Sequence, residues 1–149
     1  MKIAVASDHG GLKLKNHIKE YLLSSGYEIC DFGTDSTESC DYPDYALPAA
    51  EAVASGECDR GIIVCTTGVG VSIVANKVPG VRCALCQEEY CAEFTRRHNN
   101  ANVLALGGKV VNGERALKLV DIFLTTEFEG GKHQRRVDKI TAIEKKYCK

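Results

Sequence analysis

Cys65 is followed directly by a glycine-rich turn, Thr66-Thr67-Gly68-Val69-Gly70, which opens a predicted helix after a short apolar run. Backbone N–H groups in such a turn, beside a helix N-terminus, favour a bound anion. The same donors favour the thiolate form of a cysteine, which takes up a proton or attacks an electrophile. We therefore expect Cys65 to be reactive and next to an anion site, although its position also suits a buried core thiol.

Three common phosphate-binding motifs do not match this turn. A dinucleotide-binding fingerprint needs a small residue three positions after Gly70, where Ile73 stands, and it follows the first strand of its fold, so nicotinamide binding is a minor alternative. A Walker loop needs Gly-Lys-Ser/Thr, which does not follow the glycines. A cysteine phosphatase loop needs arginine six residues after the thiol, where Val71 stands.

Further polar residues flank other apolar runs. Ser7-Asp8-His9-Gly10 follows the first run, and His98-Asn99-Asn100 precedes the last one. In open parallel sheets ligands bind outside the carboxyl ends of the strands, so we expect these groups to converge there with Cys65. Asp8 equally suits a helix cap, and His98 suits an exposed helix end.

Five short apolar runs alternate with amphipathic stretches, which indicates repeated βα units and a parallel sheet. The predicted strands are residues 2–7, 27–32, 61–66, 81–86 and 103–106, and the first predicted helix covers residues 14–25. Further helices are expected up to Ser55-Gly56, from the glycine turn to about Lys77, and over residues 88–98 and 113–125. Pro48 limits where the second helix begins. We expect an α/β fold, a three-layer Rossmann-like sandwich, in one domain of residues 1–149.

A last helix is expected after the break at Gly130-Gly131. Its apolar residues recur at three- and four-residue intervals, at Val137, Ile140, Ile143 and Tyr147. Because this stripe follows the last strand, we expect it to pack either on its own sheet or on a second subunit. The basic segment 132–136 at the start of this helix suits a solvated face or, beside an anion site, a phosphate clamp.

Composition limits the function classes. The chain has 149 residues with 44% hydrophobic residues and a net charge of -1, typical of a folded domain without a strong field for nucleic acid or membrane. Eight cysteines without a signal peptide or a long apolar run indicate reduced thiols and a cytoplasmic protein. Cys83 and Cys86 are three apart in a predicted strand and point to opposite faces. With no paired-histidine spacing either, we predict no metal site.

Taken together, these motifs resemble the type B ribose-5-phosphate isomerase family over essentially the whole chain. The resemblance implies reversible conversion of ribose 5-phosphate to ribulose 5-phosphate, in the pentose phosphate pathway, through a cis-enediolate and without a metal or an organic cofactor. It also implies a homodimer or a dimer of dimers with shared active sites. The segments that carry it are Ser7-Asp8-His9-Gly10, Asp41-Tyr42-Pro43, Cys65 to Gly70, Ala75-Asn76-Lys77, Arg97-His98-Asn99, Asn102-Val103-Leu104-Ala105 and Glu129-Gly130-Gly131.

The resemblance assigns catalytic roles to four residues. Cys65 would carry the proton from C2 to C1, and the turn, with the Thr67 hydroxyl, would stabilise the enediolate. His98 would open the sugar ring, and Asp8 would handle the hydroxyl proton at O1 or orient the sugar. The substrate-binding residues would be Asn99 for the sugar, His9, Lys132 and Arg136 for the phosphate, and Thr66, Gly68, Val69, Gly70 and Lys109.

Three residues depart from the family pattern. Thr66 replaces a common glycine and adds a side chain that narrows the pocket, and Lys109 and Lys132 replace frequent arginines. Lysine keeps the positive charge but lacks the planar guanidinium of arginine. We therefore expect an effect on KM, because the phosphate is held less directionally, more than a loss of catalysis. The sequence does not set the length of the sugar pocket, which leaves allose-6-phosphate or galactose-6-phosphate isomerases as alternatives. A non-catalytic phosphosugar-binding module would not need Cys65.

Overall fold

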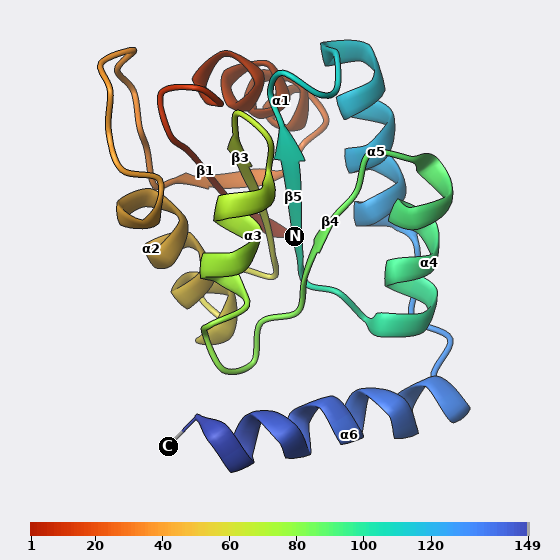
Figure 1. Cartoon of the computed structure of the whole chain (residues 1–149). Helices are drawn as coiled ribbons and strands as arrows, with labels where there is room; N and C mark the ends of the chain where they lie inside the picture. The colour runs from red at the N-terminus through yellow and green to blue at the C-terminus, as the bar shows by residue number, and fades with distance from the viewer. Residues whose placement is uncertain (149) are drawn as a thin grey trace.

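A five-stranded sheet in which every neighbouring pair is parallel forms the centre of the computed structural model, which describes residues 1–148 (Figure 1). The strand order is β2-β1-β3-β5-β4. This confirms the predicted parallel sheet, and each strand lies within two residues of its predicted ends. The strands are β1 (Lys2–Ser7), β2 (Glu28–Asp31), β3 (Arg60–Cys65), β4 (Cys83–Leu85) and β5 (Val103–Gly107).

Helices cover both faces of the sheet and complete the expected three layers (Figure 1). One face carries α1 (Leu12–Ser24), α4 (Glu89–Asn99) and α5 (Gly113–Thr125). The other carries α2 (Pro43–Ala54) and α3 (Val69–Ala75) over a core rich in alanine. Alternate residues of each strand supply the two cores, because successive side chains of a strand point to opposite faces.

The Cys83 and Cys86 thiols lie on opposite faces of the sheet, as predicted. Cys86 is part of the core under α4 and α5, whereas Cys83 packs against the core under α2 and α3. Burial raises the pKa of each thiol to about 12. Both therefore stay protonated near neutral pH and serve as core residues.

The expectation that Pro48 limits where the second helix begins is wrong. The helix α2 begins at Pro43 and contains Pro48, which we expected to limit its first turn. Pro43 suits the first turn because N–H groups there have no partner within the helix. Pro48 leaves the carbonyl of Asp44 without its usual donor, at a residue that is exposed.

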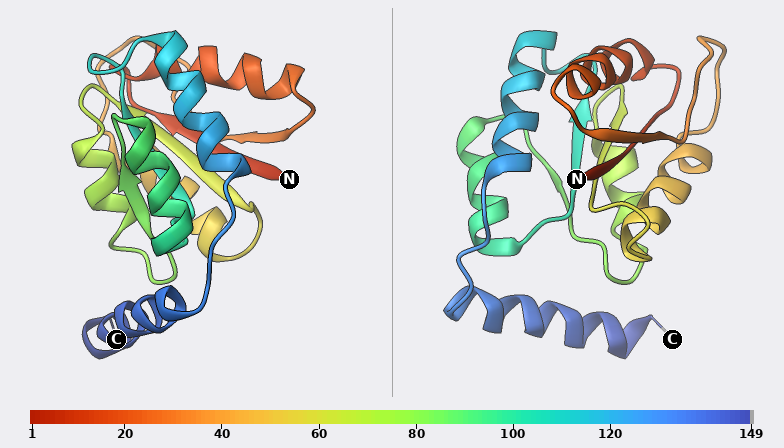
Figure 2. Two further views of the ribbon diagram at one scale, coloured as in Figure 1. Left: turned by 90° about the vertical axis from the view of Figure 1, so that its right-hand side faces the viewer. Right: turned by 180° about the vertical axis from the view of Figure 1, so that it is seen from behind.

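The last helix, α6 (Lys132–Tyr147), lies apart from the three layers, across the end of the sheet where the strands begin (Figures 1 and 2). Its Val137 is buried, but Ile140, Ile143 and Tyr147 are 47%, 60% and 72% exposed. Within the chain, therefore, the apolar stripe does not pack on its own sheet. None of the helices in residues 1–148 combines the length and apolar character that a membrane span needs.

A buried lysine ties the end of β2 to α1. Lys15 is 1% exposed, and its Nζ donates to Asp31 Oδ1 at 2.9 Å and to the carbonyl of Thr34. Asp31 also accepts from Lys19 and from the N–H of Gly33. Burial by itself would raise the pKa of Asp31, but these donors outweigh it and hold the pKa below 3.8. The charged carboxylate thus fixes the start of the loop over residues 33–42.

We predict that Asp31→Asn lowers the free energy of unfolding at pH 7 by about 2 kcal/mol, because it leaves the buried Lys15 without its anion. A carboxyl with a lowered pKa stabilises the fold above its unfolded value, and this contribution is lost as pH falls through the folded value. Urea denaturation should therefore show a smaller difference at pH 3. Asp35→Asn, in the same loop, serves as the control and should change little. Equal losses at both pH values would contradict this assignment.

Candidate active site

The strand β3 ends at Cys65, which is 5% exposed and borders the core under α2 and α3. Its Sγ accepts a hydrogen bond from the N–H of Gly68 at 3.1 Å. Gly68 has φ of +80°, and a Cβ there would lie 2.8 Å from the carbonyl carbon of Leu106. The turn thus packs on β5 and points an N–H donor at the sulfur. The thiol is also a member of this core, as the alternative interpretation of its position predicted.

The rest of the glycine turn leads directly into α3. Thr67 is exposed, and its Oγ1 accepts the N–H of Val69 at 3.3 Å. A Cβ on Gly70 would lie 2.7 Å from Cζ of Tyr42, so the ring of Tyr42 packs on the turn. This contact explains why the Asp41-Tyr42-Pro43 segment accompanies the turn.

The side chain of Thr66 packs against the loop that follows β1. A Cβ on Gly10 would overlap with Oγ1 of Thr66. The extra side chain of Thr66 therefore occupies space that the glycine leaves, between the ends of β1 and β3.

Asp8 and His9 follow β1 at the same end of the sheet. Asp8 is 8% exposed, and its Oδ1 accepts the N–H of Gly11 at 3.0 Å. Gly11 is itself the residue before α1, so Asp8 closes the preceding turn and the helix-cap interpretation is wrong. His9 is exposed, and its Nδ1 accepts the N–H of Cys40 at 3.2 Å. In the neutral ring Nε2 therefore carries the proton and is a donor.

Lys109 reaches this end of the sheet from the loop after β5. The N–H of Lys109 donates to the carbonyl of Thr66 at 3.0 Å, and the N–H of Gly108 donates to the carbonyl of Cys65 at 2.7 Å. These bonds hold the two loops together. The structure thus gathers Asp8, His9, the residues from Cys65 to Gly70, and Lys109 at the carboxyl end of the sheet.

The remaining predicted site residues lie at the other end. His98 and Asn99 belong to the last turn of α4, and Lys132 and Arg136 to the first turns of α6. Because α4 runs antiparallel to the strands, its last turn lies near their amino ends (Figure 1). The five steps between the six residues of β3 make this separation roughly 17 Å, at about 3.3 Å per step. The expected convergence of His98 and Asn99 with Cys65 within one chain is therefore wrong.

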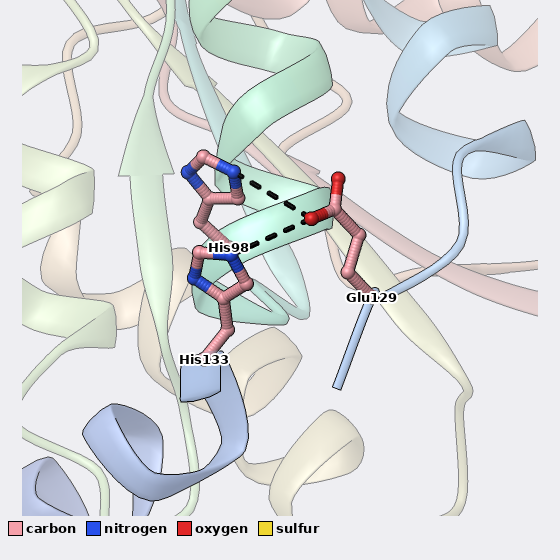
Figure 3. Close-up of side chains that lie close together, drawn as sticks. All are labelled: His98, Glu129 and His133. Carbon is pink, nitrogen blue, oxygen red and sulfur yellow. Dashed lines mark ion pairs between the residues drawn. The ribbon is translucent and has the colours of Figure 1, made fainter. Parts of the chain in front are cut away.

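His98 belongs to a cluster at the amino end of the sheet, which we call the histidine cluster: His98, Glu129 and His133 (Figure 3). The two imidazole rings stack with centroids 4.0 Å apart and 9° between their planes. Oε1 of Glu129 lies 3.8 Å from Nε2 of His98 and 3.4 Å from Nε2 of His133. Burial and the neighbouring His98 lower the pKa of His133, so its neutral form is favoured.

Neither Glu129 nor His133 was assigned a role of its own from the sequence, and His133 entered only as part of the basic segment 132–136. The i, i+4 spacing of these two residues was the available signal, but the Gly130-Gly131 break falls between them and hid it. Their contact with His98 joins the start of α6 to the end of α4 and depends on the tertiary fold.

Arg96 fixes the segments around this cluster, and no motif in the sequence pointed to it. Arg96 is 3% exposed, and its guanidinium donates to Oδ1 of Asn100 at 2.8 Å and to the carbonyls of Ala101 and Thr126 at 2.7 and 3.2 Å. Burial lowers the pKa of Arg96 to about 10, and it remains charged at neutral pH. These bonds join the end of α4, which carries His98, to the segment after α5.

The fold and these residues match a known class of enzymes. A family model described as Ribose/Galactose Isomerase matches residues 3–140, and the chain belongs to this family. Ribose-5-phosphate isomerase B of Escherichia coli is 51% identical over 145 residues, which cover 97% of each chain.

Solved structures agree with this assignment. Ribose-5-phosphate isomerase B of Clostridium thermocellum has a TM-score of 0.97 at 58% identity and 99% coverage of each chain. The structure of ribose-5-phosphate isomerase B from Mycoplasma genitalium with bound ribulose-5-phosphate has a TM-score of 0.93 at 46% identity, covering 97% of this chain and 96% of that one.

We predict that Gly68→Ala destabilises the protein more than Gly26→Ala. Both glycines have positive φ, of 80° and 92°, so each alanine introduces left-handed strain of about 1–2 kcal/mol. Only at Gly68 does the new Cβ also meet backbone, whereas nothing lies within 4 Å at Gly26. Urea denaturation of the two variants measures this difference. Equal losses would show that the turn does not depend on its close approach to β5.

Proposed function

We propose that the protein is a cofactor-independent aldose–ketose isomerase that interconverts ribose 5-phosphate and ribulose 5-phosphate through a cis-enediolate. The observation that carries this proposal is Cys65 beside a glycine turn whose N–H reaches its sulfur at 3.1 Å, in a chain of the Ribose/Galactose Isomerase family. The relative from Mycoplasma genitalium, with ribulose-5-phosphate bound, supports the choice of substrate.

The reaction needs a base and a site for negative charge. In the aldose-to-ketose direction the Cys65 thiolate takes the proton from C2, which leaves an enediolate, and the resulting thiol returns that proton to C1. The hydroxyl proton lost from O2 passes to O1, which completes the exchange. A positioned base contributes roughly 10²- to 10⁴-fold in rate. Each preorganised donor to the enediolate adds about 3 kcal/mol, and we assign this role to the turn's N–H groups and the Thr67 hydroxyl. Asp8 handles the hydroxyl proton at O1 or orients the sugar.

A complete site requires a second copy of the chain. Cys65 lies at one end of the sheet, whereas His98 and Asn99, which we assign to ring opening and sugar binding, lie at the other. In a dimer whose two-fold axis runs across the strands, the amino end of one protomer lies beside the carboxyl end of its partner, and two equal sites result. The phosphate would then lie between His9 and Lys109 of one protomer and the basic residues Lys132 and Arg136 of the partner.

The exposed stripe of α6 supports this dimer. A groove of about 530 Å³ runs between α6 and the body of the protein, and Ile140, Ile143 and Tyr147 line it. Apolar side chains with such exposure are favoured contacts for a second subunit, because burying each one contributes about 1.5–3 kcal/mol. The eight cysteines, all unpaired in residues 1–148, fit a reducing compartment, and we propose a cytoplasmic location.

We predict that Cys65→Ala lowers kcat for ribose 5-phosphate by about 10²- to 10⁴-fold, because the base is lost. Affinity for ribulose 5-phosphate, measured by calorimetry, should stay within a few-fold, because the phosphate contacts remain. Cys58→Ala is the matched control: Cys58 is buried in the same core, where burial raises its pKa to about 11, and its replacement should leave turnover unchanged. Normal turnover in Cys65→Ala would remove the proposed base.

We predict that Ile143→Asp converts a dimer into folded monomers and abolishes turnover together with dimerisation. A buried aspartate has no partner in the apolar stripe, which makes association costly. Leu23→Asp, at a residue 52% exposed near the end of α1, is the control and should remain dimeric and active. Mass measurement by light scattering, alongside the activity assay, tests both. A monomeric variant with full activity would refute the shared site.

A further inference from the structure

We propose that the histidine cluster binds a divalent transition-metal ion such as Zn²⁺, and that this ion inhibits the isomerase. One nitrogen from each of His98 and His133 and one carboxylate oxygen of Glu129 all lie within 4.8 Å of one another. Two imidazoles and one carboxylate are a ligand set that zinc takes in proteins, with a fourth position left to water. The metal takes no part in the reaction proposed above.

The distances between the donor atoms of the cluster approach those between the ligands of a zinc ion. Ligands at about 2.0–2.1 Å from a tetrahedral zinc ion stand roughly 3.3 Å apart. Oε1 of Glu129 already lies 3.4 Å from Nε2 of His133 and 3.8 Å from Nε2 of His98. The two rings are stacked and parallel, so their lone pairs run side by side. Binding therefore needs the rings to tilt toward a common point, and the partly exposed His98 is free to make that movement.

Contacts outside the cluster hold its members in place. The N–H of Glu129 donates to the carbonyl of Arg97 at 3.0 Å, and Nη1 of Arg97 lies 3.4 Å from Oε2. This leaves Oε1 facing the two histidines (Figure 3). The side chain of His133 is only 10% exposed, so little of its freedom is lost on binding. Such supporting contacts orient metal ligands, and their loss typically lowers metal affinity about 10- to 100-fold.

The donor set and the surrounding charge define the class of ion. Imidazole suits zinc, copper, nickel and cobalt, whereas magnesium and calcium prefer sites built from oxygen alone. The neutral imidazole is the form that ligates, and the lowered pKa of His133 favours that form. Arg97, Lys132 and Arg136 add positive charge nearby, which weakens cation binding and makes the site easily emptied.

Inhibition follows from the proposed role of His98 and therefore rests on the proposed function. A metal ion on the ring nitrogen removes the lone pair that a proton transfer requires. Ribose 5-phosphate is mostly cyclic, and zinc should block its opening at His98. The ion also occupies the space beside Lys132 and Arg136, where we place the substrate phosphate.

Calorimetric titration of metal-free protein with ZnCl₂, without substrate, tests the site directly. The exposed Cys91 and Cys148 are replaced by serine in every protein, so that surface thiols do not take up zinc. We expect one ion per chain, and a loss of affinity of at least about 10-fold in His133→Gln and in Glu129→Gln. His17→Gln removes an exposed histidine of α1 and should bind as the parent does. Equal affinity in the parent and His133→Gln, or no binding at all, would overturn the proposal.

The second arm measures initial rates on ribose 5-phosphate with and without ZnCl₂, each protein being compared with its own zinc-free rate. We expect inhibition that EDTA reverses in the parent and in His17→Gln, and a shift to at least about 10-fold higher zinc concentration in His133→Gln. Zinc bound without inhibition would overturn the inhibitory role. A zinc-free protein without isomerase activity would instead refute the proposed function, and the calorimetry would still decide the metal site.

Discussion

A helix that joins two parallel strands must run antiparallel to them, and this constraint governs the whole arrangement of functional residues. Side chains that follow a strand lie at one end of the sheet, and side chains in the last turn of a helix lie at the other. Cys65 belongs to the first group and His98 to the second. For the reaction that we propose, a single chain therefore carries the two sets of residues at opposite ends of its sheet. Two-fold association is the simplest arrangement that joins them.

The half-site at the carboxyl end depends on close packing of backbone. The turn after Cys65 approaches β5 so closely that only glycine fits at residue 68, and hydrogen bonds from Gly108 and Lys109 hold the two loops together. Because these contacts involve main chain, the N–H directed at the sulfur is set before any substrate arrives. Preorganised donors of this kind stabilise developing charge without further rearrangement. The same packing leaves Cys65 only 5% exposed.

Local pattern was sufficient to predict the elements and most of the carboxyl-end residues. Alternating apolar runs located all five strands, and the residues after β1 and β3 gathered as the rule for parallel sheets requires, whereas Lys109 after β5 came from the family resemblance. Three predictions were wrong for identifiable reasons. Pro48 stands inside α2, where the carbonyl that loses its donor belongs to the exposed residue Asp44, and Asp8 bonds to the residue before the helix and not to the helix itself. His98 was placed by its proximity in sequence to β5, without regard to the direction of α4.

Other features depend on contacts distant in sequence and could not be predicted. The histidine cluster joins the end of α4 to the start of α6, and Arg96 reaches the carbonyl of a residue thirty positions later. Single-sequence periodicity carries no information on which such segments meet. The exposure of the apolar stripe of α6 also depends on tertiary packing. The same spacing of apolar residues would be found in a helix that packs on its own sheet.

The shared site is tested most directly by mixing two inactive variants, Cys65→Ala and His98→Asn, unfolding them together and refolding the mixture. Half of the refolded dimers then contain one chain of each kind, and one of their two sites combines an intact Cys65 with an intact His98 from the other chain. The account predicts that activity returns to about one quarter of the wild-type value. A mixture as inactive as its two components, although mixed dimers are detected by mass, would contradict it.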